Sequence, residues 1–396
     1  MKTDGSSDGK PHQAEYLDTP QAVSRWMSTI GGSRLVALDT EGASFHRFVD
    51  RIYLLQVSTR ERSAIIDPLP IGKPAELGAL IEDPSVEIVF HDADYDLRLL
   101  HQDYGWQVRN VFDTRVAAQL LGIKAFGLAA LLDQFFGVKL DKKHQRADWS
   151  MRPLTKDMLD YAAQDTMYLP ALRDELKAQL EKKGRWSWAR EEFTRLEATK
   201  WASDDDANAF MKMKGARDLS RRELALLREL VAWRNSVAAE HDKATFRILG
   251  NEPLFEIAKL QPTDKTALSA IKGMPRGILE SRWKEIIDAI ARGAAVPEND
   301  LPRYPRGARW DRDPDFDTRV SAIKTARDAI ATQLDMDTGV LFPREKMEAV
   351  ARANPASMED FEKLTELRRW QVEVLGRAIV DALKPHRPRE ESPYKD

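Results

Sequence analysis

The chain has 396 residues, of which 42% are hydrophobic and 32% are charged, values that are ordinary for a globular protein of two or three domains. The formal net charge of −3 argues against a wholly electrostatic, histone-like nucleic-acid binder, although it leaves room for a local basic track. Cysteine is absent, which excludes disulfides, zinc–thiolate sites and thiol nucleophiles and suits a reducing, cytoplasmic compartment; neither a membrane-spanning apolar run nor a signal-peptide core is found.

Residues 15–205 alternate between strand and helix patterns. Apolar or β-branched runs bounded by polar turns predict strands at residues 34–39, 51–59, 63–67, 86–90 and 111–114. Helices are predicted at residues 75–83 and 94–103 and around the stretch YAAQD (161–165), with Thr155 as an N-cap. This order of elements predicts an α/β domain with a mixed sheet.

Two helical blocks follow the last predicted strand. We expect helical domains at residues 215–295 and 315–385, joined by a proline-rich, charged linker at residues 296–314. The two ends, residues 1–14 and 386–396, are expected to be disordered tails.

The two helical blocks are related in sequence. A shift of 93 residues aligns them without a gap, and the matching pairs include Arg234 with Arg327, Ala238 with Ala331, Asp242 with Asp335, Ala258 with Ala351 and Pro262 with Pro355. Register that holds across two loops indicates duplication, so we predict a duplicated all-α domain.

Four carboxylates and a tyrosine stand at the ends of the predicted elements of the α/β domain. Asp39 and Glu41 close the first strand, where residues i and i+2 share a face. Asp96 begins a helix after a strand, and Tyr161 lies one helical turn before Asp165. Each motif alone is also consistent with solvated turn charges or with a tyrosine packed beside the core.

Together, these carboxylates favour a metal site. Oxygen ligands from separate elements suit Mg²⁺ or Mn²⁺. Two such ions about 3.5–4 Å apart can activate a water and stabilise the leaving oxygen when a phosphodiester is cleaved. Without a metal, clustered carboxylates would repel one another. We therefore expect two divalent ions, Mg²⁺ or Mn²⁺, as cofactors.

These motifs resemble the DEDDy family of 3′–5′ exonucleases. The stretch RADWSMRPLTKDMLDYAAQD (146–165) is similar to the ribonuclease D family in particular, and residues 219–262 resemble an HRDC module. Asp160 occupies the position that is histidine in the other branch of the superfamily, which places the chain in the tyrosine branch. The resemblance implies a ribonuclease H-like mixed sheet flanked by helices, an HRDC domain and a second, diverged HRDC-like domain.

The resemblance also implies roles for the site residues. Asp39 would bridge both ions, Glu41 and Asp165 would complete the first metal site, and Asp96 would hold the second. Tyr161, with an ordinary pKa of about 10, would orient the attacking water rather than act as a base. The implied activity is two-metal 3′→5′ exoribonuclease cleavage, which releases 5′-mononucleotides from RNA 3′ ends, with tRNA precursors as expected substrates and no required protein partner.

Six further residues are predicted to contact the substrate: Gln56, His91, Arg146, Trp149, Lys243 and Arg247. Packing is the alternative role for Gln56, His91 and Trp149, and a solvated basic surface is the alternative for the cations. Asp113 is a candidate for supporting the site. Many relatives have a bulky wedge residue directly after the first motif, whereas this chain has Gly42, so Phe45 or Phe48 could replace the wedge or it could be missing.

Basic residues also gather at the entrance of the first helical block: Lys212, Lys214, Arg217, Arg221 and Arg222. With Lys243 and Arg247 they predict a phosphate-tracking surface. The second block has Met336 and Val340 at the positions of Lys243 and Arg247, so we expect it mainly to pack against the rest of the protein.

Two alternatives to the exoribonuclease hypothesis stay open at this point. A DNA exonuclease of the same superfamily would use the same carboxylates, because selection of RNA depends on contacts with the 2′-hydroxyl that no motif here reveals. A catalytically silent RNA-binding scaffold is the second alternative. The presence of all four carboxylates and the tyrosine favours an enzyme.

Overall fold

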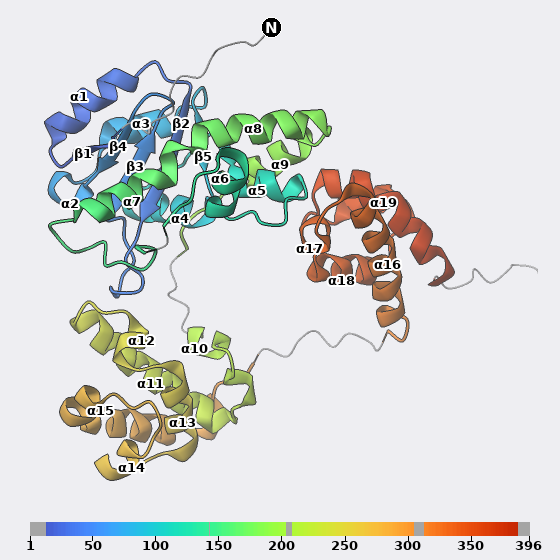
Figure 1. Ribbon diagram of the computed structural model, residues 1–396. Helices are drawn as coiled ribbons and strands as arrows, with labels where there is room; N and C mark the ends of the chain where they lie inside the picture. The colour runs from blue at the N-terminus through green and yellow to red at the C-terminus, as the bar shows by residue number, and fades with distance from the viewer. Residues whose placement is uncertain (1–12, 142, 203–207, 305–312, 387–396) are drawn as a thin grey trace, which may run out of the picture.

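The computed structural model describes residues 13–141, 143–202, 208–304 and 313–386, which form one α/β domain and two helical domains (Figure 1). Most of both predicted tails, Lys142 and part of the predicted linker lie outside these ranges. Among the described residues, none of the helices combines the length and apolar composition that crossing a bilayer requires.

The described strands of the α/β domain form a mixed sheet in the order β1-β4-β3-β2-β5-β6. They are β1 (Glu15–Leu17), β2 (Leu35–Glu41), β3 (Leu54–Ser58), β4 (Ser63–Ile66), β5 (Glu87–Phe90) and β6 (Val111–Asp113). The β2–β3 and β3–β4 pairs are antiparallel, and the other neighbours are parallel. The predicted mixed sheet is confirmed, and β1 is an additional edge strand.

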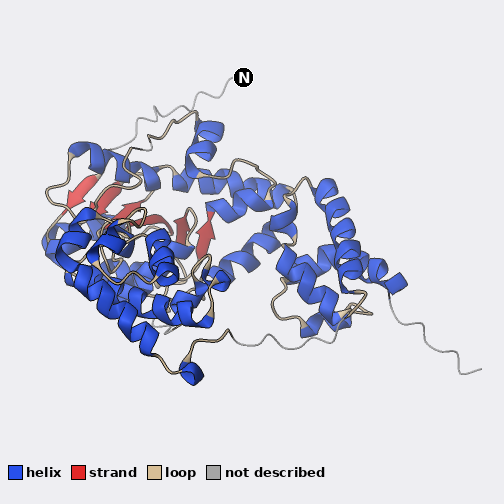
Figure 2. Ribbon diagram, turned by 90° about the horizontal axis from the view of Figure 1, so that it is seen from below, coloured by secondary structure: helices blue, strands red, loops and turns tan. Residues whose placement is uncertain are grey.

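Helices cover both faces of this sheet (Figure 2), which explains why the central strands β2 and β3 have no exposed residue. The helices of this domain are α1 (Pro20–Ile30), α2 (Pro68–Ile71), α3 (Ala75–Ile81), α4 (Asp94–Tyr104), α5 (Thr114–Leu120), α6 (Leu128–Phe136), α7 (Lys156–Met167), α8 (Leu169–Lys182) and α9 (Trp186–Leu196). The hydroxyl of Thr155 accepts the N–H of Met158 at 3.2 Å, so it is the N-cap of α7.

Among the described residues, four helices of the first helical domain recur in the second. The first contains α10 (Ala209–Lys212), α11 (Arg221–Glu240), α12 (Thr245–Ile248), α13 (Asn251–Leu260), α14 (Lys265–Ser269) and α15 (Arg276–Ala295). The second contains α16 (Phe316–Leu334), α17 (Thr338–Leu341), α18 (Arg344–Ala353) and α19 (Arg369–Leu383). The bounds of α17 and α18 lie 93 residues beyond those of α12 and α13, the same offset as in the sequence alignment.

A buried arginine makes the same hydrogen bond in both copies. Arg234 donates to the carbonyl of Leu249 at 3.4 Å, and Arg327 donates to the carbonyl of Phe342 at 3.1 Å. Donor and acceptor are thus 15 residues apart in each copy. The shared bond satisfies a carbonyl at the end of α12 or α17, where the helix leaves such groups unpaired. The structure therefore supports the duplication independently of helix lengths.

The second helical domain shares a hydrophobic core with the α/β domain. Trp370 on α19 is buried, stacks on Trp188 of α9 with ring centroids 5.0 Å apart, and donates its indole N–H to Glu192 at 2.8 Å. Met336 lies in the same core, in agreement with the predicted packing role of this copy. Arg185 donates to backbone carbonyls on both sides of the contact.

The first helical domain contacts the α/β domain through the loop after β2, which extends towards α12 (Figure 1). The Ala244 N–H donates to the His46 carbonyl at 3.2 Å, and Arg47 pairs with Asp242 at 3.4 Å. These contacts are polar and lie close to the end of β2. The position of this domain is therefore linked to the loop that follows the first carboxylate motif.

Two of the entrance arginines of the first helical domain, Arg221 and Arg222, bind backbone carbonyls of their own domain. Arg222 donates to the carbonyls of Ala294 and Val296 at 2.9 and 2.5 Å, and Arg221 donates to that of Leu301 at 3.1 Å. These bonds satisfy carbonyls at and beyond the C-terminus of α15. The charges are used inside the domain, which corrects the expectation for these two residues.

The shared core predicts that Trp370→Ala destabilises the protein. Removing a buried tryptophan side chain costs about 3–5 kcal/mol, so the midpoint of chemical denaturation should fall markedly. Trp201→Ala is the matched control, because Trp201 is 42% exposed and its loss should change the midpoint little. Equal midpoints for the two variants would contradict the shared core.

Candidate active site

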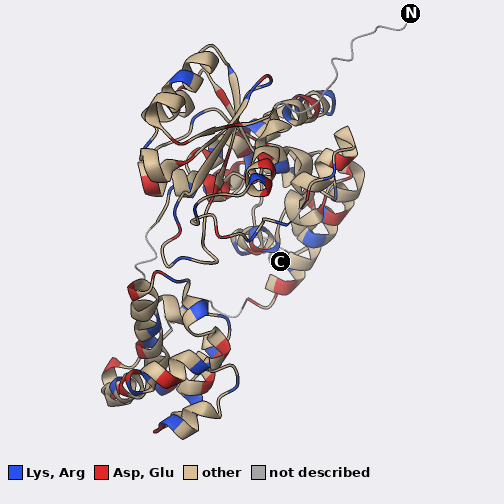
Figure 3. Cartoon of the chain, turned by 60° about the vertical axis from the view of Figure 1, so that its left-hand side comes forward, with Lys and Arg blue, Asp and Glu red and all other residues tan. Residues whose placement is uncertain are grey.

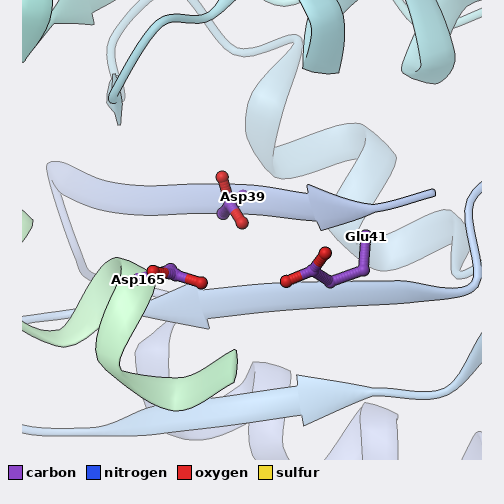
Figure 4. Close-up of side chains that lie close together, drawn as sticks. All are labelled: Asp39, Glu41 and Asp165. Atoms are coloured by element: carbon purple, nitrogen blue, oxygen red, sulfur yellow. The ribbon is translucent and has the colours of Figure 1, made fainter. Parts of the chain in front are cut away.

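Three carboxylates converge at the end of β2. Asp39 and Glu41 lie on β2 and Asp165 lies on α7, which faces them (Figure 4). One oxygen of each carboxylate lies within 4.8 Å of the others. The structure therefore brings together three of the four carboxylates that the sequence singled out.

The alternation of β2 explains this convergence. Val36 and Leu38 pack into the core formed with α1, α3 and α4, whereas Ala37 packs into the core formed with α5, α8 and α9. Asp39 and Glu41 continue the Ala37 series, since successive side chains of a strand point to opposite faces. They therefore lie on the side of the sheet that α7 crosses, where Asp165 meets them.

Asp96, at the start of α4, reaches the same strand from the other side. Thr40 points away from Asp39 and Glu41, and both its N–H and its hydroxyl donate to Asp96 Oδ1, at 2.9 and 2.6 Å. Asp96 is buried, and it lies outside the set of three carboxylates defined above. Asp96 therefore lies beside the site, and its Oδ1 already accepts two hydrogen bonds from Thr40.

Asp113 positions the turn that leads to Asp96. Its carboxylate accepts the N–H of Ala93 at 2.7 Å and also caps α5. Asp92 and Asp94 are exposed and pair with Arg115 and Arg98 respectively. Asp113 therefore supports the site through the backbone, while Asp92 and Asp94 remain at the surface.

The surroundings of the site raise the pKa values of its carboxylates. Burial, with the neighbouring charge of Asp165, raises the pKa of Asp39 well above its usual range, and burial also raises that of Glu41. Burial and then the charge of Asp96 raise the pKa of Asp165 to about 7. Groups this close cannot all ionise without a compensating cation. An all-oxygen ligand set of this kind fits Mg²⁺ or Mn²⁺.

Tyr161 stands one turn before Asp165 in an aromatic setting. Its ring lies 6.1 Å from that of Trp149 and 5.7 Å from that of His144. Burial and the charges of Asp165 and Glu41 raise the pKa of Tyr161 further above its already high value. The hydroxyl is therefore protonated at neutral pH and can donate or accept a hydrogen bond without acting as a phenolate.

Two predicted substrate contacts are corrected by burial. Gln56 is fully enclosed, and its amide donates to Glu41 Oε1 at 3.4 Å from the neighbouring strand. Trp149 is also fully enclosed and packs beside Tyr161. Neither side chain is open to an RNA strand, so both support site residues instead.

The remaining predicted contacts differ in accessibility. His91 Nδ1 lies 2.9 Å from the Thr114 hydroxyl, and burial lowers the pKa of His91 to about 4, so at neutral pH it offers no charge to a phosphate. Arg146 and Lys243 are exposed. Arg247 is exposed too, but its Nε donates to the Phe45 carbonyl at 2.5 Å, which makes it a docking residue between domains.

Gly42 is explained by a tyrosine from another motif. A Cβ at position 42 would lie 2.1 Å from the hydroxyl of Tyr95, which donates to Asp50 at 2.5 Å. Asp50 also accepts the N–H of Ala43 at 2.9 Å, so this group fixes the backbone after Glu41. Phe48 packs against the core of the first helical domain, which removes it as a wedge candidate.

Sequence reasoning missed Thr40, Asp50 and Tyr95 as residues that position the site. Thr40 carried one usable signal, because it lies between two carboxylates and must point to the opposite face of the strand. Asp50 and Tyr95 are separated by 45 residues, and no local pattern links them.

Comparison with known proteins gives a consistent assignment. Residues 14–181 match a 3′-5′ exonuclease family model, and residues 223–290 and 317–383 match the HRDC domain model. The chain is 31% identical to ribonuclease D of Granulibacter bethesdensis over 361 residues, which cover 90% of this chain and 89% of that protein. It is 30% identical to ribonuclease D of Gluconacetobacter diazotrophicus over 344 residues, which cover 86% and 85% respectively.

The fold agrees with a solved structure. Escherichia coli RNase D matches with a TM-score of 0.72 at 24% identity, over 95% of this chain and 100% of that one. The two residue ranges that match the HRDC model coincide with the two helical domains, and the range that matches the exonuclease model contains the carboxylate site. With an exonuclease domain followed by two HRDC domains and close similarity to these relatives over most of its length, the chain belongs to the ribonuclease D family.

Proposed function

We propose that this protein is a two-metal 3′→5′ exoribonuclease that releases 5′-mononucleotides from structured RNA precursors such as those of tRNA. Family membership gives the coarser activity, which is that of a metal-dependent exoribonuclease. The number of ions, the site residues and the RNA class are our proposals. The Escherichia coli protein with this fold is described as an exoribonuclease involved in structured RNA processing.

The observation that carries the proposal is the convergence of Asp39, Glu41 and Asp165 beside Asp96. The first three would hold one divalent ion, and Asp39 with Asp96 would hold the second. Two bound ions would supply an activated water and charge stabilisation for the leaving oxygen. A scaffold with no catalytic role gives no reason to keep clustered, mutually repelling carboxylates.

The protein itself positions the reactants. Tyr161, kept protonated by its surroundings, would hold the attacking water by a hydrogen bond at the edge of the carboxylate cluster. Thr40 fixes Asp96, and Gln56 donates to Glu41, so the ligand oxygens are held before substrate arrives. Such preorganisation removes reorganisation from the chemical step.

Replacing Asp39 should abolish activity. Asp39→Asn removes the ligand shared by both proposed ions, so cleavage of a 5′-labelled RNA should slow by at least about 1,000-fold. Asp160→Asn, an exposed change on α7, is the control and should cut like the wild type. The assay compares single-stranded RNA, matching DNA and a 3′-extended tRNA, each with Mg²⁺, Mn²⁺ or chelator. Equal cutting of DNA would contradict the RNA assignment, and a fully active Asp39→Asn would contradict the site.

Tyr161→Phe tests the hydroxyl alone, because phenylalanine keeps the ring packing against Trp149. Loss of one hydrogen bond in a charged site should lower kcat by about 10- to 100-fold. Affinity for Mn²⁺, measured by calorimetry, should not change, because Tyr161 is not a ligand. A wild-type kcat would show that the water is positioned by another group.

The raised carboxylate pKa values predict a pH-dependent effect of metal on stability. In metal-free protein, Asp165 holds a proton that the unfolded chain releases near pH 4, so its contribution to stability is present below about pH 4 and is lost as pH rises to about 7. Metal binds the ionised form. The rise in Tm on adding Mn²⁺ should therefore be larger at pH 8 than at pH 5.

The matched variants for this experiment are both on α7. Asp165→Asn should reduce the Mn²⁺-induced rise in Tm at pH 8, whereas Asp160→Asn should retain it. An equal rise at both pH values, or a full rise in Asp165→Asn, would refute the linkage between this carboxylate and metal binding.

A further inference from the structure

Two exposed phenylalanines meet where the exonuclease domain contacts the first HRDC domain. Phe45, on the loop after β2, is 44% exposed, and Phe246, on α12, is 53% exposed. Their ring centroids are 6.4 Å apart with an interplanar angle of 73°. Unlike an isolated exposed ring, a pair of adjacent aromatic rings offers a continuous apolar surface on which a planar group can stack.

Cations surround this pair. The guanidinium of Arg146 lies 5.3 Å from the centre of the Phe45 ring, and it forms no ion pair with any residue that the structure describes. Lys243 and Arg247, from the first HRDC domain, are exposed in the same segment as Phe246. An arginine stacked on an aromatic ring still has N–H donors for a phosphate.

The pair lies close to the carboxylate site and is held in place. Phe45 follows Glu41 by four residues, so their Cα atoms are at most about 14 Å apart. The Phe45 carbonyl accepts from Arg247, and the loop is fixed near its start by the bond from Ala43 to Asp50. A strand whose 3′ end enters the site would therefore pass within reach of these rings.

The chemistry of the surface favours single-stranded RNA over other partners. Exposed aromatic rings combined with cations are the elements by which proteins bind single strands, because every base has a face that can stack. A purely electrostatic track is less suitable here, since Figure 3 shows acidic residues interspersed with basic ones on the first HRDC domain. Stacking would supply affinity that charge alone does not.

We propose that Phe45 and Phe246, with Arg146, form a stacking platform for the nucleotides just upstream of the RNA 3′ end. This inference rests on the proposed exoribonuclease function. Because one ring comes from each domain, RNA would bridge the exonuclease and HRDC domains. Stacking makes no hydrogen bond with a base edge, so the platform would accept any sequence. It would bind only a strand long enough to extend from the active site to the two rings.

The test is binding of 5′-labelled RNA by the full-length protein in chelator, where no cleavage occurs, measured by fluorescence anisotropy. Phe246→Ala and Phe246→Leu should each weaken binding of a ten-nucleotide RNA by about tenfold, the usual effect of losing one aromatic stacking partner. Phe246→Tyr should bind like the wild type, since it keeps the ring. Leu260→Ala, which removes a 64% exposed apolar side chain from α13, is the matched control and should also bind normally.

The leucine variant separates stacking from domain docking, because leucine keeps apolar contact with Phe45 but has no aromatic face. Wild-type affinity in Phe246→Leu, or unchanged affinity in Phe246→Ala, would overturn the platform. The proposed function is tested separately: it fails if the wild-type protein does not shorten the RNA when Mn²⁺ is supplied.

Discussion

The structure depends on holding four carboxylates, three half-buried and one buried, close together against their mutual repulsion. The sheet does this by placing Asp39 and Glu41 on one face of β2 while Thr40, between them, binds Asp96 from the other. The fourth carboxylate, Asp165, comes from α7 across the sheet. The elements that supply these residues belong to different parts of the chain, so the site exists only when the whole α/β domain is folded. A divalent cation would neutralise this repulsion, which favours its binding there.

The two HRDC domains have the same internal packing but differ at their surfaces. Arg234 and Arg327 make equivalent buried bonds, which shows that the internal packing of the domain was retained. On the short helix after the first long helix, one copy has Arg247, which holds the loop beside the active site. The other copy has Val340 at the equivalent position, and this side chain packs against the core shared with the α/β domain. The second copy thus packs into a core shared with the α/β domain, and the first contacts the loop that follows the first carboxylate motif.

Much of this architecture was predictable from local patterns. Strand alternation placed Asp39 and Glu41 on one face, and helical spacing paired Tyr161 with Asp165, because both depend only on neighbours in sequence. The burial of Gln56 was not predictable, since it depends on the register between β2 and β3, where it lies opposite Asp39. The docking role of Arg247 was missed for the same reason: its partner, Phe45, is 202 residues away. The short edge strand β1 carries too few residues for a periodic signal.

The contact between Gly42 and Tyr95 has an evolutionary consequence. The hydroxyl of Tyr95 occupies the volume that any side chain at position 42 would need, and its bond to Asp50 keeps it there. Position 42 can therefore gain a side chain only if Tyr95 is replaced or moves. A relative with a bulky residue after the first motif must carry a smaller or differently oriented side chain before its second-motif aspartate, so the two positions should change together as lineages diverge.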